Sequence, residues 1–246
     1  MQKKALVTGA AKGIGRAISE VLLSKDYDVY GTFYSSKDMA CAFARSHKNV
    51  ILFQVDLRDR VQIFDFLKQL DGICFDAVIN NAGVFQQEKF NDYDMTIWDE
   101  TLAVNLTAPF IISLKLQDQI KPGGSIVNIT SDGGFKGAFS CIAYVASKAA
   151  LMNLTKSLAN NFARKKVRVN AIAPGWIDTD MSTPESYEAA RITPLGRNGT
   201  PDEIAKVVGY LISDEASFIT GTIVTVDGGY NAVDYIMLQE SKKIDN

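Results

Sequence analysis

Short apolar runs alternate with longer stretches of helical periodicity along the whole chain. Seven runs have the length and composition of buried strands: Lys4–Thr8, Val29–Phe33, Val50–Val55, Ala77–Asn80, Ser125–Ile129, Val167–Ala171 and Thr222–Val226. The stretches between them predict helices at Ile14–Ser24, Ser36–Ser46, Arg58–Leu70, Ile97–Gln119, Ile142–Ala163 and Pro201–Ser213. Strands that alternate with helices are typical of a parallel sheet covered on both faces. With right-handed crossovers, the pattern predicts an α/β fold with a doubly wound, seven-stranded parallel sheet.

The composition fits one globular domain and marks no second one. The 246 residues are 47% hydrophobic and 22% charged, which is ordinary for a chain that folds alone. We therefore expect residues 1–246 to form a single domain. The longest stretch without a clear period is Asp178 to Thr200, and we expect it to form a lid. The tail after Tyr230 mixes apolar and charged residues, which suits either a subunit contact or a frayed terminus.

Charge and cysteine content argue against several functional classes. The formal net charge is -2 and the Lys and Arg residues are scattered, so no nucleic-acid partner is expected. No run of about 18 apolar residues is present and the start lacks a signal-peptide pattern, so we expect a cytoplasmic protein with no membrane span. Cys41, Cys74 and Cys141 are far apart and outside any CxxC spacing, which favours reduced thiols and no metal site. His47 fits a solvated loop better than a catalytic base.

A glycine-rich turn joins the first predicted strand to the first predicted helix. The segment from Thr8 to Gly15 reads TGAAKGIG, with the spacing GxxxGxG. Glycines let the backbone turn sharply and approach a pyrophosphate, whose charge is met by N–H groups at a helix N-terminus. Such a turn could also merely connect strand to helix. Its position at the first crossover favours dinucleotide binding.

The same segment resembles the cofactor loop of the short-chain dehydrogenase/reductase family, and further motifs agree with it in order and spacing. Asp56-Leu57 follows the third strand, where the family has an Asp that contacts adenine, although an Asp there could also cap a helix. NNAG at Asn80–Gly83 follows the fourth strand, and Pro174–Thr179 resembles the PGxIxT segment that holds the nicotinamide carboxamide. The resemblance covers residues 3–230. It implies a Rossmann fold and a nicotinamide dinucleotide cofactor.

The residues after the second strand favour NADP(H) over NAD(H). Domains that prefer NAD commonly place an acid about 20 positions beyond the glycine loop. Here the segment 34–37 reads YSSK, and Asp38 better fits the first turn of the next helix. Lys12 and Lys37 could meet a 2′-phosphate with Ser35 as a hydrogen-bond donor, or could equally be solvated surface charges. The predicted cofactor-binding residues are Gly9, Lys12, Gly13, Ile14, Gly15, Ser35, Lys37, Asp56, Leu57, Asn81, Ala82, Gly83, Tyr144, Lys148, Pro174, Gly175, Ile177 and Thr179.

Four residues match the family's catalytic positions: Asn105, Ser131, Tyr144 and Lys148. Tyr144 and Lys148 are four apart on a predicted helix and therefore share a face. A YxxxK motif alone arises by chance, Asn105 could be a buried polar residue, and Ser131 could cap a turn. The catalytic assignment rests on the order in which the four residues occur along an alternating α/β pattern. Because the pKa of free tyrosine is about 10, positive charge from Lys148 and the oxidised nicotinamide is needed to stabilise its phenolate.

The matched residues imply a reaction. In the reducing direction, Ser131 and Tyr144 hydrogen-bond the substrate carbonyl, NADPH delivers hydride and Tyr144 gives its proton. The resemblance implies that Asn105 holds a water that links Lys148 to solvent. The sequence therefore predicts an NADP-dependent oxidoreductase that interconverts a ketone and a secondary alcohol.

The substrate and partners are less defined by the sequence. Similarity to bacterial 3-oxoacyl-acyl-carrier-protein reductases lies in TDM, PLGR, DEAS and VDGG, at Thr179, Pro194, Asp214 and Val226. These segments are widespread in the family, so alcohol, sugar and hydroxysteroid dehydrogenases stay open. Lys121 and the basic cluster 164–166 could receive an acidic carrier protein, or be solvated helix ends. The alternative of another class is a non-catalytic NADPH-binding regulator, which the loss of a catalytic residue would favour; none is lost.

Two of the predicted helices suggest a homotetramer. Ile97–Gln119 and Ile142–Ala163 resemble the paired interface helices of the family. Their apolar positions include Leu102, Leu106, Leu151 and Leu154. The same leucines could instead face the sheet.

Overall fold

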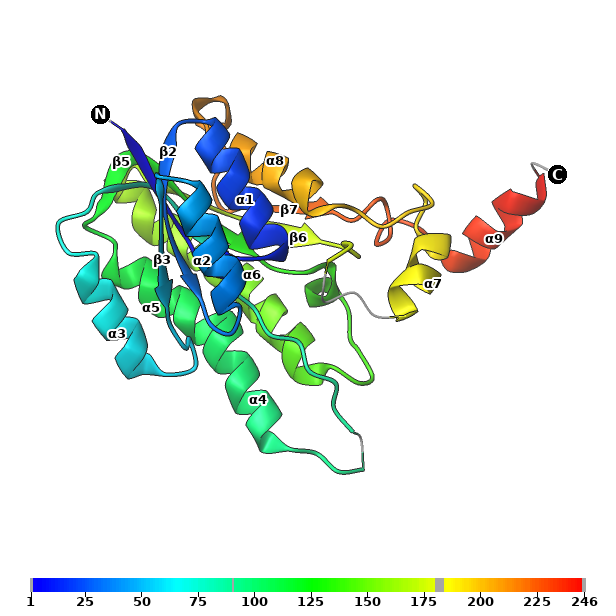
Figure 1. Cartoon of the computed structure of the whole chain (residues 1–246). Helices are drawn as coiled ribbons and strands as arrows, with labels where there is room; N and C mark the ends of the chain where they lie inside the picture. The colour runs from blue at the N-terminus through cyan, green and yellow to red at the C-terminus, as the bar shows by residue number, and fades with distance from the viewer. Residues whose placement is uncertain (1, 90, 180–183, 245–246) are drawn as a thin grey trace.

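A parallel sheet forms the centre of the computed structural model, which describes residues 2–89, 91–179 and 184–244 (Figure 1). Its seven strands within those residues are β1 (Lys3–Val7), β2 (Tyr27–Phe33), β3 (Val50–Gln54), β4 (Phe75–Asn80), β5 (Ile120–Ile129), β6 (Arg168–Pro174) and β7 (Ile223–Val226). Their order is β3-β2-β1-β4-β5-β6-β7, and neighbouring strands pair in parallel. The predicted doubly wound α/β fold is confirmed.

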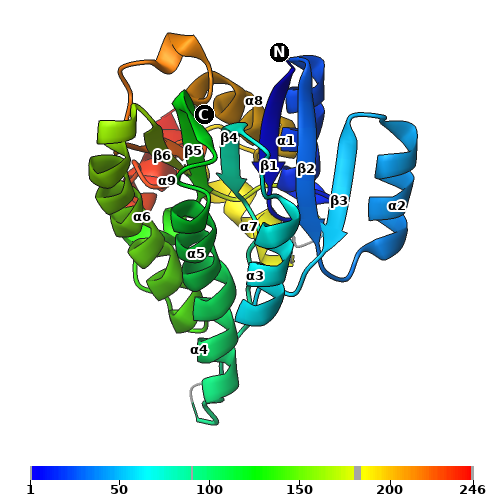
Figure 2. The same cartoon turned by 90° about the vertical axis from the view of Figure 1, so that its left-hand side faces the viewer.

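Helices cover both faces of the sheet (Figure 2). One face carries α1 (Gly13–Ser24), α2 (Lys37–Ser46) and α8 (Pro201–Leu211). The other carries α3 (Arg60–Gln69), α4 (Met95–Leu102), α5 (Ala108–Lys115) and α6 (Ile142–Phe162). The spacing of apolar residues explains the layers: Ile18 and Leu22, four apart on α1, are both fully buried against the sheet. Among the described residues, no helix combines the length and the apolar character needed to cross a bilayer.

The helix predicted over Ile97–Gln119 is present but contains a π-helical turn and ends earlier than predicted. Helix α4 passes into a π-helical turn over Ala103–Thr107, and α5 then ends at Lys115. The π turn contains Asn105, whose buried side chain bonds to the segment after β4 rather than pointing to solvent. Buried polar contacts of this kind are frequent where a helix widens at a functional site.

Strand β5 begins earlier than the sequence pattern predicts. It starts at Ile120 instead of Ser125, although the PGG segment at 122–124 has the composition of a loop. Ile120 pairs with Phe75 at the start of β4, and the register shifts before the ladder resumes. Tertiary pairing therefore overrides the local preference of proline and glycine.

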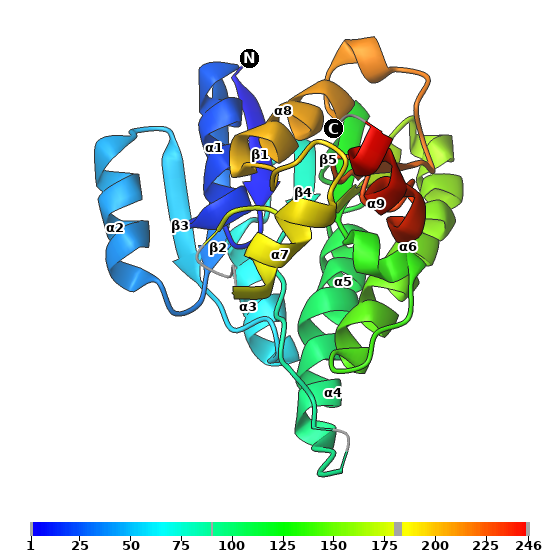
Figure 3. The ribbon, with the colours of Figure 1, turned by 90° about the vertical axis from the view of Figure 1, so that its right-hand side faces the viewer.

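The expected irregular lid and the tail both contain a helix. The lid range 178–200 includes α7 (Pro184–Ile192), which begins with a proline at a position where helices tolerate it; residues 180–183 lie outside the described part of the chain. The tail contains α9 (Tyr235–Ile244). Both helices lie to one side of the two helical layers, at the right in Figure 1 and facing the viewer in Figure 3.

The strand order reverses between β1 and β4. The chain moves from β1 outward to β2 and β3, then returns to place β4 on the other side of β1. In doubly wound sheets, ligands bind outside the carboxyl ends of the strands at this switch point. The turns after β1 and β4 are therefore the expected position of the site.

A polar network is buried between the sheet and α6. The Asn80 amide donates to Ser113 Oγ (3.2 Å) and to Asn128 Oδ1 (2.8 Å). Asn128 Nδ2 donates to Thr155 Oγ1 (2.9 Å), which in turn donates to the Leu151 carbonyl (2.8 Å). All four polar side chains are at most 2% exposed. The network fixes β4 and β5 against α6, which carries the predicted tyrosine and lysine.

Replacing Asn128 with Ala is expected to destabilise the fold strongly. The change takes one buried hydrogen-bond partner from Asn80 and one from Thr155, which keep their bonds to Ser113 and to the Leu151 carbonyl. Loss of a buried partner costs about 1–3 kcal/mol, so we expect a loss of about 2–4 kcal/mol in the free energy of unfolding. Denaturant titration measures it. Asn161→Ala is the control, because Asn161 is exposed and bonds only within its own helix; its cost should stay within about 0.5 kcal/mol. Equal losses in the two variants would contradict the role of the network.

Candidate functional site

The turn after β1 forms a cradle of backbone at the start of α1. Gly9 has φ +68° and Gly13 has φ +53°, values that favour glycine. A Cβ at Gly15 would lie 2.0 Å from the Gly9 carbonyl oxygen, so no side chain fits there. Lys12, at the N-cap of α1, makes no side-chain cap, and the Ile14 side chain packs on the core. The helix start therefore suits a phosphate group bound by backbone N–H groups.

The NNAG turn after β4 holds this cradle in place. Thr8 Oγ1 accepts hydrogen bonds from the backbone N–H groups of Asn81 (3.0 Å) and Ala82 (2.9 Å). The Asn81 amide donates to the carbonyls of Thr8 (2.9 Å) and Gly9 (3.3 Å). The turns after β1 and β4 are thus one hydrogen-bonded unit.

Asn105 and Lys148 meet beside Gly83. A Cβ at Gly83 would lie 3.3 Å from Lys148 Nζ and 3.4 Å from Asn105 Oδ1. The Asn105 amide accepts from Val84 N (2.8 Å) and donates to the Val84 carbonyl (3.0 Å) and to Ser147 Oγ (3.1 Å). Asn105 therefore lies close to Lys148, and its side chain ties the π turn to the segment that follows NNAG. The bound water expected at Asn105 remains a prediction.

Lys148 lies on α6 one turn beyond Tyr144 and points toward the end of β5. It is 3% exposed, and its ammonium donates to the Ile129 carbonyl at 3.0 Å. Lys148 Nζ is 5.6 Å from the centroid of the Tyr144 ring. Burial lowers the pKa of Lys148 to about 8, because a buried ammonium loses hydration.

Ser131 and Tyr144 form the centre of the candidate catalytic group. Ser131 Oγ accepts from Gly133 N at 3.2 Å and lies 3.3 Å from a carboxylate oxygen of Asp132. Burial raises the pKa of the Tyr144 hydroxyl; its hydrogen bond with Ser131 lowers that pKa, and Asp132 and Cys141 raise it further. Burial is the largest of these effects, so the phenol keeps its proton at neutral pH.

The PGxIxT segment, which follows β6, ends beside the glycine loop. Pro174 ends β6, and a Cβ at Gly175 would lie 2.7 Å from the Asp227 side chain. The Ile177 side chain packs on the core. A Cβ at Gly13 would be 3.8 Å from the Thr179 methyl group, so the end of this segment lies directly beside the start of α1.

Asp56 is engaged by an arginine that the sequence prediction missed. The Arg58 guanidinium donates to Asp56 Oδ2 at 2.7 Å and holds the pKa of that carboxyl below its usual range. The same guanidinium donates to Glu100 (3.0 Å) on α4 and to the Tyr34 hydroxyl (2.5 Å) after β2. Leu57 is 7% exposed and belongs to the core.

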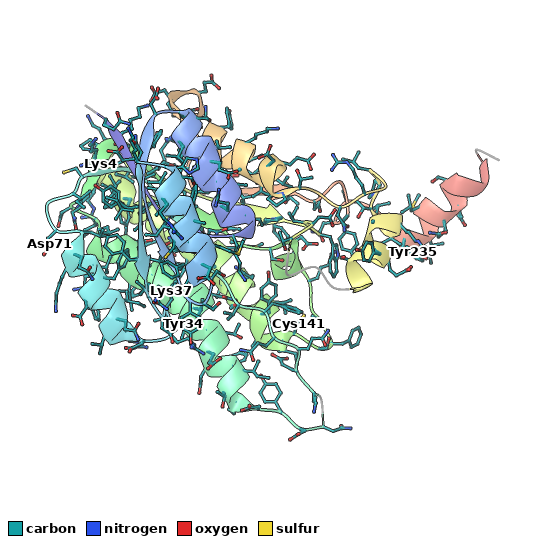
Figure 4. The ribbon with its side chains drawn as sticks, in the orientation of Figure 1. Lys4, Tyr34, Lys37, Asp71, Cys141 and Tyr235 are labelled. Carbon is teal, nitrogen blue, oxygen red and sulfur yellow. The ribbon has the colours of Figure 1, made fainter. Side chains whose placement is uncertain are left out.

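The residues proposed for a 2′-phosphate lie at the rim of the site. Lys12, Ser35 and Lys37 are all exposed. Tyr34 and Lys37 lie at the same end of the sheet (Figure 4), and Asp38 is in the first turn of α2, as expected.

Two further acids near the catalytic group were not predicted. Asp132 directly follows Ser131, so a systematic look at the neighbours of each candidate would have found it. Glu88 has no such signal, because it lies 54 positions before Ile142, to whose N–H it bonds. Within residues 2–89, 91–179 and 184–244, no cluster of three or more His, Cys, Asp or Glu side chains could hold a metal ion.

The geometry combines a backbone cradle at the start of α1 with a candidate proton donor. The space that only glycine leaves at residue 15, together with the uncapped start of α1, fits a pyrophosphate. Ser131, Tyr144 and Lys148 lie at the carboxyl ends of the strands next to that cradle. Two hydroxyls and an ammonium so placed can polarise a carbonyl and exchange a proton with it.

Known proteins share this arrangement of sequence and fold. A family model described as Enoyl-(Acyl carrier protein) reductase matches residues 9–231. The 3-oxoacyl-[acyl-carrier-protein] reductase of Aquifex aeolicus (strain VF5) is 39% identical in an alignment of 241 positions that covers 92% of this chain and 96% of that protein. The acetoacetyl-CoA reductase of Rhizobium meliloti (strain 1021) is 35% identical in an alignment of 238 positions that covers 93% of this chain and 98% of that protein.

A solved structure agrees with these relatives. A short chain dehydrogenase from Burkholderia cenocepacia J2315, in complex with NADP, matches with a TM-score of 0.88 and 31% identity, covering 93% of this chain and 98% of that one. The family match spans nearly the whole sheet, and the relatives cover more than nine-tenths of the chain. The chain therefore belongs to the short-chain dehydrogenase/reductase family of oxidoreductases.

Proposed function

We propose that this chain interconverts a ketone and a secondary alcohol with NADP(H), and that Tyr144 is its proton donor. The observation that carries the proposal is the convergence of Ser131, Tyr144, Lys148 and Asn105 beside the glycine cradle. When bound, the nicotinamide supplies or accepts a hydride.

The protonation states of the two central residues suit reduction. With its pKa raised by burial, Tyr144 holds a proton at neutral pH, whereas Lys148, with a pKa of about 8, is charged. Ser131 and Tyr144 donate hydrogen bonds to the substrate oxygen, and the Tyr144 proton passes to that oxygen as negative charge develops. The Lys148 ammonium then stabilises the phenolate that remains. In the reverse direction, the positive charge of the oxidised cofactor adds to that of Lys148.

The choice of NADP(H) rests on charge at the adenosine end and on a relative. The Burkholderia cenocepacia structure was solved with NADP. In this chain Lys12 and Lys37 are exposed at the rim, and the Arg58 charge is already engaged by Asp56 and Glu100. The two lysines therefore supply the cationic groups that a 2′-phosphate needs.

The preferred substrate class is a 3-oxoacyl thioester, which the Aquifex aeolicus and Rhizobium meliloti relatives support by name. The exposed Phe85 ring lies edge-to-face on Tyr144 at 5.2 Å and gives the proton donor an apolar neighbour. The position of Lys121 gives no support for the docking of an acidic carrier protein near the site. Lys121 pairs with Asp76 (2.8 Å), and eight residues of β5, about 26 Å, separate it from Ile129.

The alternative of a non-catalytic NADPH-binding regulator is disfavoured because every proposed catalytic residue is present and the set converges. Following NADPH absorbance with 3-oxoacyl thioesters, sugars and steroid ketones separates enzyme from regulator and identifies the substrate class. If NADPH is oxidised with none of these compounds, the non-catalytic regulator becomes the better proposal.

We infer a cytoplasmic homotetramer from the family and from the free thiols of Cys41, Cys74 and Cys141. The leucines give this assembly only partial support. Leu151 is 1% exposed, and Leu154 packs on the core. Only Leu102 and Leu106 are partly exposed without being members of the two core clusters.

Tyr144→Phe should nearly abolish ketone reduction while NADPH affinity stays unchanged. The variant keeps the ring and loses only the hydroxyl that acts on the substrate. Loss of positioned proton transfer is worth 10² to 10⁴ in rate, so kcat should fall by at least about a thousandfold. Steady-state kinetics, cofactor fluorescence and thermal unfolding check the three parts. A well-folded variant that keeps more than about a tenth of wild-type kcat would rule out Tyr144 as the donor.

The affinity for NADPH should fall as pH rises through the pKa of Lys148. The charged ammonium is expected to hold the cofactor ribose, and this group loses its proton above a pH of about 8. Wild-type Kd should therefore rise between pH 7 and 9, by at most about tenfold per unit. In Lys148→Met, the Kd for NADPH should be higher than in the wild type at pH 7 and should not show this rise with pH. Parallel pH curves for the two proteins would contradict the assignment.

NADPH should bind more tightly than NADH, and Lys37→Asp should reverse or erase the difference. A hydrogen bond to a charged group contributes about 1.5–3 kcal/mol, so the ratio of the two dissociation constants should change by at least about tenfold. Fluorescence titration with both cofactors measures it. Lys206→Asp is the control, because it makes the same charge change on α8 at an exposed position. Equal affinity of the wild type for both cofactors would overturn the NADP(H) assignment.

A further inference from the structure

A buried glutamate caps the helix that carries Tyr144 and Lys148. Glu88 is 7% exposed. Its Oε2 accepts from Ile142 N at 2.6 Å, and its Oε1 accepts from Ala143 N at 2.7 Å. Both N–H groups belong to the first turn of α6, where backbone donors lack partners within the helix. Cys141, the N-cap residue, makes no side-chain cap, so a distant part of the chain supplies it.

The segment that contains Glu88 holds the start of α6 at two further points. Glu88 N donates to the Ser140 carbonyl at 2.8 Å. Three residues earlier, the Phe85 ring packs edge-to-face on the Tyr144 ring, with 5.2 Å between centroids. Tyr144 directly follows Ala143, so the place of its Cα is set by the turn that Glu88 binds.

The chemistry of the cap matches the first turn of a helix. A carboxylate offers two acceptor oxygens for two N–H groups, and its charge is favourable at the positive end of the helix dipole. The same negative charge does not help Tyr144 to form a phenolate. The contribution of Glu88 to catalysis must therefore come from geometry.

We propose that Glu88 is a positioning residue for Tyr144: its carboxylate fixes the first turn of α6 and so keeps the Tyr144 hydroxyl beside Ser131 and the substrate oxygen. The proposal rests on the role of Tyr144 proposed above. Phe85 contacts the Tyr144 ring, and Glu88 binds the backbone N–H groups that directly precede Tyr144.

Cys141 gives a readout of the cap that does not depend on turnover. It lies at the start of α6 (Figure 4). Burial raises the pKa of its thiol, and the nearby Glu88 charge raises it further. Removal of that charge should lower the thiol pKa and speed its reaction with a disulfide reagent, because the thiolate is the reactive form.

The test is Glu88→Gln in a Cys41→Ser/Cys74→Ser background, where Cys141 is the one remaining thiol of the three in the chain. The amide keeps the size of the side chain but offers one oxygen, and its NH₂ group faces the second N–H. We expect kcat to fall between about tenfold and a hundredfold, as for a small displacement of a reacting group. KM and the Kd for NADPH should change by less than about twofold, because substrate and cofactor contacts are retained. Cys141 should react faster, and the amides of Ile142 and Ala143 should exchange faster with solvent.

Asp94→Asn is the matched control. Asp94 caps α4 by accepting from Thr96 N at 2.8 Å, so the variant removes a cap carboxylate from a helix that carries none of the proposed proton-transfer residues. Its kcat should stay within about twofold of the parent. Glu88→Asp keeps both oxygens on a shorter side chain, and it should recover part of the lost kcat. If Glu88→Gln does not fold, Glu88→Asp takes its place as the test, and a smaller loss of kcat is then expected.

Several outcomes would overturn the proposal. A folded Glu88→Gln with unchanged kcat, or one that loses kcat and NADPH affinity together, would show that Glu88 does not position Tyr144. An equal loss of kcat in Asp94→Asn would show that Glu88 acts only through the general stability of the fold. Failure of the proposed chemistry looks different, because Tyr144→Phe would then stay active while the Cys141 and amide-exchange changes in Glu88→Gln would still appear.

Discussion

The close contact between the glycine loop and the turn after β4 is the constraint on which the whole site depends. Gly15 has room for no side chain because the Gly9 carbonyl and the Asn81 amide occupy the space. Asn81 then donates two hydrogen bonds to Thr8 across the switch point of the sheet, one from its backbone N–H and one from its amide. One rigid unit therefore supports both the phosphate cradle and the NNAG turn, and the distance between cofactor and proton donor is set by packed backbone rather than by mobile side chains.

From this unit, contacts extend toward the candidate catalytic residues. Gly83 admits Lys148 and Asn105 at close range, and Val84 holds the π turn through the Asn105 amide. Glu88, a few residues further along, caps α6. A single segment of chain after β4 thus contacts the glycine loop, the π turn and the catalytic helix in succession.

The sequence predicts the sheet well because the strands depend on local pattern and order, whereas the roles of the candidate catalytic residues stay predictions. The strands are buried on both faces and stand out as apolar runs. Ser131 lies just after β5, and Tyr144 and Lys148 share α6. Features that depend on tertiary contact escape prediction. The pairing of Ile120 with Phe75 extends β5 through a loop-like segment, and buried bonding of Asn105 accompanies the widening of a helix whose sequence periodicity is continuous. Arg58 and Glu88 gain their importance from partners 42 and 54 positions away.

The π turn at Ala103–Thr107 also sets the relation between the two ends of the cofactor site. A π turn accommodates one residue more than the α-helical path, and one residue corresponds to about 100° of rotation about the helix axis. Glu100, before the turn, bonds to Arg58, whereas Asn105, within it, bonds to Val84. The extra residue changes the direction of the Asn105 side chain relative to that of Glu100. One stretch of chain thereby joins two separate loops, the one after β3 and the one after β4.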